Sequence, residues 1–136
     1  MPSFGKSSKR RLVTCHAVLQ ELMHRLIVRR DCSVVCGHRG EDDQNRAFDE
    51  GKSRVRWPDG KHNKTPSRAV DVVPWPEKWA SESAFLELSK IIKEEWVLME
   101  AKDLTQGFRL RWGGDWDGDG DREDQIFDDL PHWELI

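Results

Sequence analysis

Two histidines and one aspartate stand out in this sequence because imidazole and carboxylate side chains are common protein ligands of zinc. His62 precedes a β-branched run, residues 69–73, that has a single acid, Asp71, at its centre, and His132 lies in an apolar segment near the end. A carboxylate among buried neighbours is costly unless it is paired or binds a metal. Three such ligands would leave a fourth position open for water, as catalytic zinc requires.

The spacing of these residues also permits a second interpretation. A histidine beside an apolar strand is often a hydrogen-bonded core residue, and an aspartate in a strand can cap a neighbouring loop. Eight residues separate His62 from Asp71, which is not a compact ligand motif such as HExxH. The residues alone therefore do not decide between a metal centre and a polar cluster in the core.

The elements that must position these side chains follow from the periodicity of apolar residues. Spacings of three and four predict helices over residues 7–30 and 81–101, and an acidic start with a glycine stop predicts a short helix over 41–50. Residues 52–66 have the composition of a long loop. The predicted strands are residues 33–36, 69–73, 108–112 and 132–136. This order indicates an α+β fold with a small, mainly antiparallel sheet packed with two to three helices.

The length and composition fit one globular domain. A chain of 136 residues can bury most of its surface around one core, so we expect a single domain, residues 1–136, with one cleft. Charged residues make up 35%, but seven Trp and five Phe supply large apolar side chains. No apolar run is long enough to span a membrane, and the start lacks the apolar core of a secretory signal, so we expect synthesis in the cytoplasm.

Charge and cysteine content exclude two further classes. Residues 1–68 carry 15 Lys and Arg against 8 Asp and Glu, and residues 69–136 carry 7 against 17, but the basic residues are scattered, so we expect no nucleic-acid partner. The three cysteines, Cys15, Cys32 and Cys36, form no CxxC pair. They predict neither a disulfide framework nor a thiolate zinc site.

Three stretches together resemble the zinc D-alanyl-D-alanine carboxypeptidase and L-alanyl-D-glutamate endopeptidase family, particularly its small phage endolysins. They are VVCGHRGEDDQNRAFDEG, KHNKTPSRAVDVVPWP and DDLPHWEL, in the family's order along nearly the whole chain. The resemblance implies a hedgehog-type α+β fold, cleavage of peptidoglycan stem peptides, and zinc bound by His62, Asp71 and His132. Many members have the motif SxHxxGxAxD, whereas this chain has a longer spacing and residues 65–67 in place of the glycine, so we expect a different loop shape.

The resemblance also implies roles for three other residues, and strand alternation suggests a role for a fourth. Asp129 stands three residues before the last histidine, where the family has its general base and acid, which moves a proton from the attacking water to the leaving amine. Arg39 matches the arginine that binds substrate and the polarised carbonyl, and Gln44 matches a glutamine that contacts substrate. By strand alternation Glu134 lies on the same side as His132 and could hydrogen-bond its imidazole.

An acidic loop near the end of the sequence invites comparison with an EF-hand. Its acids and Gly120 fit the first positions of a calcium loop, but Ile126 stands where the bidentate glutamate should be. Similar endolysins carry an acidic, Trp-containing loop here and some respond to calcium. We therefore treat calcium binding as a hypothesis beside a solvated loop at the rim of the cleft, with these ligands: Asp115, Asp117, Asp119 and Asp121.

The function implied by the resemblance is cleavage of the L-Ala-D-Glu bond by a zinc peptidase, as a phage endolysin in host lysis. The alternatives are a D-Ala-D-Ala carboxypeptidase and a non-catalytic wall-binding module of the same fold. We expect a monomer that acts on peptidoglycan, does not insert into membranes, and stays in the host cytoplasm until it is released to the wall.

Overall fold

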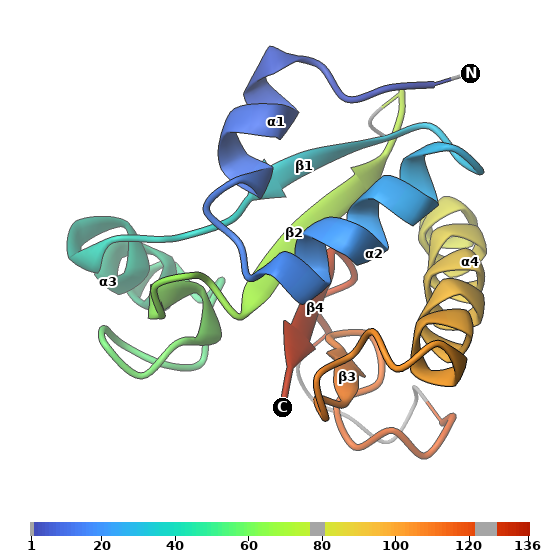
Figure 1. Cartoon of the computed structure of the whole chain (residues 1–136). Helices are drawn as coiled ribbons and strands as arrows, with labels where there is room; N and C mark the ends of the chain where they lie inside the picture. Colours follow the sequence, from blue (N-terminus) through green and yellow to red (C-terminus); the bar gives the residue numbers. More distant parts are fainter. Residues whose placement is uncertain (1, 77–80, 122–127) are drawn as a thin grey trace.

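The computed structural model describes residues 2–76, 81–121 and 128–136, and its elements confirm the predicted α+β class (Figure 1). Helices and the strands of one sheet alternate along the chain. The helices are α1 (Lys6–Leu12), α2 (Ala17–Ile27), α3 (Glu41–Asp49) and α4 (Glu82–Ala101), with a 3-10 turn η1 (Lys61–Asn63). The strands are β1 (Cys32–Cys36), β2 (Ala69–Pro74), β3 (Leu110–Trp112) and β4 (His132–Leu135).

The four strands form one antiparallel sheet in the order β1-β2-β4-β3. The last strand, β4, therefore lies between two strands that precede it, as the red arrow in Figure 1 shows. In the register of β2 with β4, Asp71 pairs with His132. Residues far apart in the sequence thus meet in the middle of the sheet.

The two faces of the sheet differ in chemistry because side chains alternate along each strand. Val70 and Val72 of β2 and Trp133 of β4 belong to the hydrophobic core. Asp71 and His132 are their alternate neighbours, so they face the opposite side of the sheet. This alternation explains how an acid stands in the middle of a β-branched strand without entering the core.

The core lies between the sheet and the long helices. Helix α2 packs against α4, α4 also contacts β2, and α1 packs along β1. The apolar faces of both long helices are almost completely buried, which agrees with their spacing of three and four. The core residues of these helices include Leu19, Leu22, Met23, Leu26, Leu88, Ile92, Trp96 and Met99.

The prediction of one helix over residues 7–30 is wrong, because the helix is broken between Val13 and His16. The break is held by the chain before β2: His16 N–H donates to the Ser67 carbonyl at 2.8 Å, and Ser67 N–H donates to Thr14 at 2.9 Å. The His16 side chain then caps α2 by accepting from Val18 N–H. Long-range hydrogen bonds have overridden a continuous helical pattern.

The remaining predicted elements are found within one or two residues of their predicted ends. The exception is the segment predicted as a loop over 52–66, which contains η1 and therefore gives His62 a fixed backbone. Among the described residues, no helix is long and apolar enough to cross a membrane.

Candidate active site

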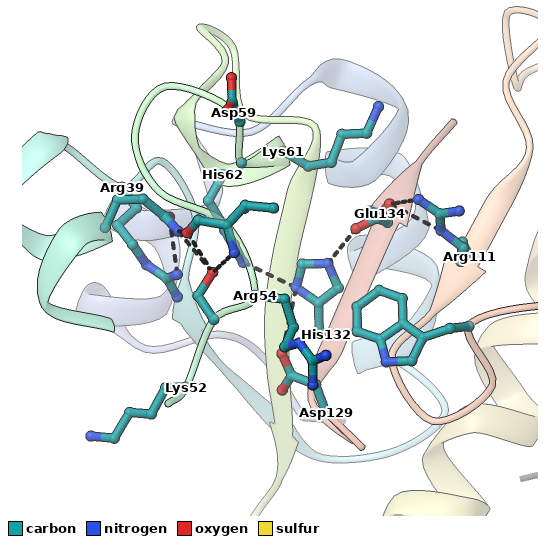
Figure 2. A pocket seen from close by; sticks show the side chains of 15 residues that line it. Arg39, Lys52, Arg54, Asp59, Lys61, His62, Arg111, Asp129, His132 and Glu134 are labelled. Atoms are coloured by element: carbon teal, nitrogen blue, oxygen red, sulfur yellow. Dashed lines mark hydrogen bonds and ion pairs between the residues drawn. The ribbon is translucent and has the colours of Figure 1, made fainter. Parts of the chain in front are cut away.

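A cleft of about 620 Å³ opens on the polar face of the sheet (Figure 2). It is lined by residues 52–55 and 59–61 and by Arg111, Trp116 and Glu134. His62 and His132 lie at the floor, and both are at least nine-tenths buried. The cleft is open to solvent and is large enough for several residues of a peptide.

Three side-chain atoms converge at the floor of this cleft. His62 Nε2 lies 3.1 Å from Asp71 Oδ1 and 3.2 Å from His132 Nδ1, and His132 Nδ1 lies 3.2 Å from Asp71 Oδ1. The three donors come from η1, β2 and β4, and they form a nearly equilateral triangle. Two imidazole nitrogens and a carboxylate oxygen arranged in this way can face one metal ion and leave its other positions open.

The longer spacing between His62 and Asp71 does not separate them. Arg68 N–H donates to the Lys61 carbonyl at 3.0 Å and closes the loop just before β2. Residues 64–67 lie within this closed loop, so its length is independent of the distance between the two ligands. The difference from the family motif is therefore confined to the loop.

The main-chain carbonyl of Gly37 orients the imidazole of His62 from the side opposite the triangle. His62 Nδ1 lies 2.7 Å from the Gly37 carbonyl, which can only accept, so Nδ1 carries a proton and Nε2 is the nitrogen that can act as a metal ligand in the triangle. Cys36 Sγ lies 3.7 Å from the same Nδ1, and Cys36, His62 and Asp71 form a second group of nearby ligand atoms. The bond to Gly37 engages Nδ1, the nitrogen near Cys36, whereas Nε2 faces Asp71 and His132, which favours the set with His132.

His132 has a corresponding partner on its other nitrogen. Its Nε2 lies 2.7 Å from Oε1 of Glu134, which confirms the contact expected from strand alternation. The second oxygen of Glu134 accepts from Nε and Nη2 of Arg111, at 3.1 and 2.6 Å. The imidazole is therefore fixed by a buried carboxylate that is itself held by a guanidinium, an arrangement that orients metal-ligating histidines.

The electrostatics of the triangle favour a bound cation. Burial by itself would lower the pKa of His62, but the adjacent Asp71 carboxylate raises it to about 10. Burial also opposes ionisation of Asp71, and the two imidazoles more than compensate, so that the pKa of Asp71 lies well below its usual range. Asp71 is thus ionised in a buried place, and it strongly stabilises positive charge beside it.

Asp129 borders the triangle. Its Oδ2 lies 4.0 Å from His132 Nδ1, and its main chain is fixed by bonds to Gly113 and His132. Burial, followed by the charge of Asp71, raises the pKa of Asp129 to about 6. A carboxyl group with a pKa near neutrality can both accept and return a proton, which is the property that a general base and acid needs.

Arg39 and Gln44 line the same cleft but differ in what they can reach. Arg39 Nη2 lies 3.6 Å from Asp71 Oδ2, so its guanidinium stands beside the triangle. Gln44 is 1% exposed and its amide nitrogen donates to Ser53 Oγ and the Val55 carbonyl. Gln44 also accepts a bond from Arg39, so it holds the cleft wall and the arginine together. The substrate contact predicted for Gln44 remains a prediction.

The acidic loop brings three of its four predicted calcium ligands together. One oxygen each of Asp115, Asp117 and Asp119 lies within 4.8 Å of the others. Asp121 uses its N–H to donate to Asp119 at 2.8 Å. Ile126, at the position of the missing glutamate, lies outside the described residues.

The sequence analysis missed several residues of the cleft, and two of them contact the residues of the site. Trp116 places its ring 5.3 Å from that of His132, and Arg111 is the cross-strand partner of Glu134. The opposite charges of Arg111 and Glu134 were a usable signal, but only once the pairing of β3 with β4 was known. No sequence pattern predicts the contact of Trp116 with His132.

A buried His-Asp-His triangle, a bordering carboxyl group with a pKa near neutrality and an open peptide-sized cleft define the site of a hydrolase. The chain belongs to the phage L-alanyl-D-glutamate peptidase family, whose sequence pattern it matches over residues 2–136. The family and the endopeptidase function expected from the sequence are thereby confirmed.

Two proteins illustrate the relationship. The chain is 28% identical over 128 residues to the L-alanyl-D-glutamate peptidase of Escherichia phage T5, and the match covers 90% of this chain and 88% of that protein. The crystal structure of the Serratia marcescens L-Ala D-Glu endopeptidase ChiX has a similar fold, with a TM-score of 0.71 and 20% identity. That comparison covers 99% of this chain and 91% of ChiX.

Proposed function

We propose that the chain is a zinc-dependent endopeptidase that hydrolyses the L-alanyl-D-glutamate bond of the peptidoglycan stem peptide. The observation that carries the proposal is the triangle of His62 Nε2, Asp71 Oδ1 and His132 Nδ1, with sides of 3.1 to 3.2 Å. Zinc held by these three residues would supply the Lewis acidity that polarises a carbonyl group and lowers the pKa of water.

The other residues of the cleft perform the proton and charge chemistry. Asp129 is mostly ionised at pH 7 because its pKa is about 6, so it can accept a proton from the attacking water. The same carboxyl group then returns this proton to the leaving amine as the C–N bond breaks. Arg39 stands beside Asp71, where its guanidinium can stabilise negative charge on the carbonyl oxygen. The products are a new alanine carboxylate and a new glutamate amine.

The test combines metal analysis with identification of the bond that is cut. Wild type is compared with His132→Ala, Asp129→Ala and the control His24→Ala, an exposed histidine of α2. Wild type and the control should contain stoichiometric zinc and release new amino-terminal glutamate from purified walls. His132→Ala should lose both properties, and Asp129→Ala should keep zinc and wall binding but lose hydrolysis.

Other outcomes identify the alternatives. Release of free alanine instead of glutamate amino ends would indicate a D-Ala-D-Ala carboxypeptidase. Wall binding without any released amine would indicate a binding module. A folded, metal-free wild type that still cuts the wall would refute the role of zinc.

We propose further that the enzyme acts as an endolysin, which reaches the wall after another protein has opened the host membrane. This proposal is supported by the family match and by the phage origin of the relative. Expression in host cells should leave them intact until a membrane-permeabilising agent is added, and lysis should then be rapid. Lysis without the agent would contradict the proposal.

The acidic loop supports a second metal in this enzyme, calcium. Asp115 is 7% exposed, and within the described part of the chain its Oδ1 has no hydrogen-bond partner, although its Oδ2 accepts from Gly120 N–H. A buried carboxylate oxygen without a hydrogen-bond partner, next to the carboxylates of Asp117 and Asp119, is suited to calcium, which binds oxygen ligands. Trp116 lies in this loop and contacts His132, so ordering of the loop would also fix one side of the cleft.

Calorimetric titration with calcium chloride tests this site. We expect binding to wild type and at least a tenfold weaker affinity for Asp117→Asn, with Asp103→Asn as a control outside the loop. Equal titration curves for the two variants would contradict a calcium site here.

A further inference from the structure

Lys61 is a cation of the cleft that the reaction scheme above does not use. It immediately precedes His62, so its Cα lies about 3.8 Å from that of a proposed zinc ligand. Its backbone is fixed by the bond that Arg68 N–H donates to its carbonyl. The side chain is half-buried and lines the cleft, and within residues 2–76, 81–121 and 128–136 no hydrogen bond or ion pair engages its ammonium group.

The other basic side chains of the cleft are already engaged. Arg39 lies near Asp71, Lys52 lies 3.2 Å from Glu50, and Arg54 also has an interaction partner. Arg111 uses Nε and Nη2 to bind Glu134. Figure 2 shows the Lys61 side chain extending away from Arg39 and Lys52, toward the side of the cleft where Glu134 and Arg111 lie. Among the basic side chains that line the described part of the cleft, Lys61 is thus the one without a hydrogen bond or ion pair.

The proposed substrate brings a negative charge to this cleft. Glutamate has two carboxyl groups, and when its amine is in the bond to be cut, only one of them continues the stem peptide. The other remains a free carboxylate a few bonds from the reacting nitrogen. The carboxylates of Asp59, Asp129 and Glu134 line the cleft and Asp71 lies close to Arg39, so a cation near the scissile bond favours binding of a negatively charged group there.

We infer that Lys61 is a specificity residue whose ammonium binds the free carboxylate of the glutamate that follows the scissile bond. The inference rests on the proposed function, because it assumes that an L-alanyl-D-glutamate bond is the one cut. Lys61 is adjacent to His62 in the sequence. The residue that binds the glutamate carboxylate is therefore fixed next to a residue of the triangle, which couples substrate recognition to catalysis. A neutral side chain at the same position would leave the substrate charge without a partner.

The experiment compares two synthetic peptides that differ in one group. Both contain the L-Ala-D-Glu bond, and in the second peptide the free glutamate carboxylate is replaced by the carboxamide. Values of kcat/KM are measured for wild type, Lys61→Met, Lys61→Arg and the control Lys64→Met, an exposed lysine at the end of the same turn. Zinc content and melting temperature are measured for each variant.

Wild type and Lys64→Met should prefer the acid peptide by about ten- to a hundredfold, which is the usual strength of a hydrogen bond to a charged group. Lys61→Met should lose this preference by cutting the acid peptide more slowly while cutting the amide peptide at the wild-type rate, and Lys61→Arg should recover part of it. An equal loss on both peptides would mean that Lys61 only supports the turn, and an unchanged preference would mean that another group reads the carboxylate. If wild type cuts neither peptide between alanine and glutamate, the proposed function itself fails, and this inference fails with it.

Discussion

In the proposed zinc site, replacement of Glu134 should weaken zinc binding without removing any of the three proposed ligands. Glu134 is 5% exposed, and its Oε1 lies 2.7 Å from His132 Nε2, on the side of the imidazole opposite the triangle. His132 helps to keep Glu134 ionised, because despite burial its bond to this carboxylate lowers the pKa of Glu134. The carboxylate therefore makes the imidazole more electron-rich and fixes the orientation of its ring.

The size of the effect follows from these contacts. Loss of the carboxylate behind a ligating histidine typically lowers metal affinity by about 10- to 100-fold, or about 1.4 to 2.8 kcal/mol. We expect Glu134→Ala at the upper end, because it also leaves the Arg111 guanidinium, which lines the same cleft, without its counter-charge. We expect Glu134→Gln at the lower end, because an amide oxygen can still accept a hydrogen bond from Nε2.

The assay is a competition for zinc between the protein and a chromophoric chelator. The control is Glu94→Gln, since Glu94 is a half-exposed carboxylate of α4 that binds Arg29 far from the cleft. The control should match wild type, and the order of affinity should be wild type, Glu134→Gln, Glu134→Ala. A Glu134→Ala protein that is folded and binds zinc as tightly as wild type would refute this account of the site.

Three further predictions concern packing and reactivity. A side chain on Gly113 would overlap the main-chain carbonyl of Asp129 and lie 2.9 Å from its Cβ, so Gly113→Ala should lose wall hydrolysis while retaining zinc. Leu19→Ala should lower the free energy of unfolding by about 2 to 5 kcal/mol in urea titration, because Leu19 is fully buried in the core; a loss below 1 kcal/mol would contradict its place there. Burial raises the pKa of Cys15 and of Cys32 to about 12, so that at pH 8 only about one thiol in ten thousand is a thiolate, and iodoacetamide should label neither residue until the protein unfolds.

Local pattern predicted the fold wherever local forces decide it. The helix over residues 81–101 and the strands around Asp71 and His132 were found because burial of one face imposes a period on the sequence. The break between Val13 and His16 was missed because it depends on hydrogen bonds with Ser67, fifty residues later in the chain. No window of sequence contains that information.

In the active site, too, some residues could be predicted from local sequence and others could not. The proposed ligand set came from resemblance, since the spacing from His62 to Asp71 alone left a polar core cluster open; the structure brings the three side chains together. Glu134 could be predicted because alternation along one strand places it beside His132. Arg111 and Trp116 could not, because their positions depend on the register between strands and on the course of a loop.

The position of β4 has a consequence for how the enzyme is made. Residues 132–135 enter the sheet between β2 and β3, which are both synthesised earlier, and they bring His132 to the triangle. While this segment is still inside the ribosome, β2 and β3 have no common neighbour and only two of the three ligands have emerged. Loss of this segment would remove the central strand β4 and the third proposed ligand together, so we expect a nascent chain, or a chain truncated just before His132, to lack activity.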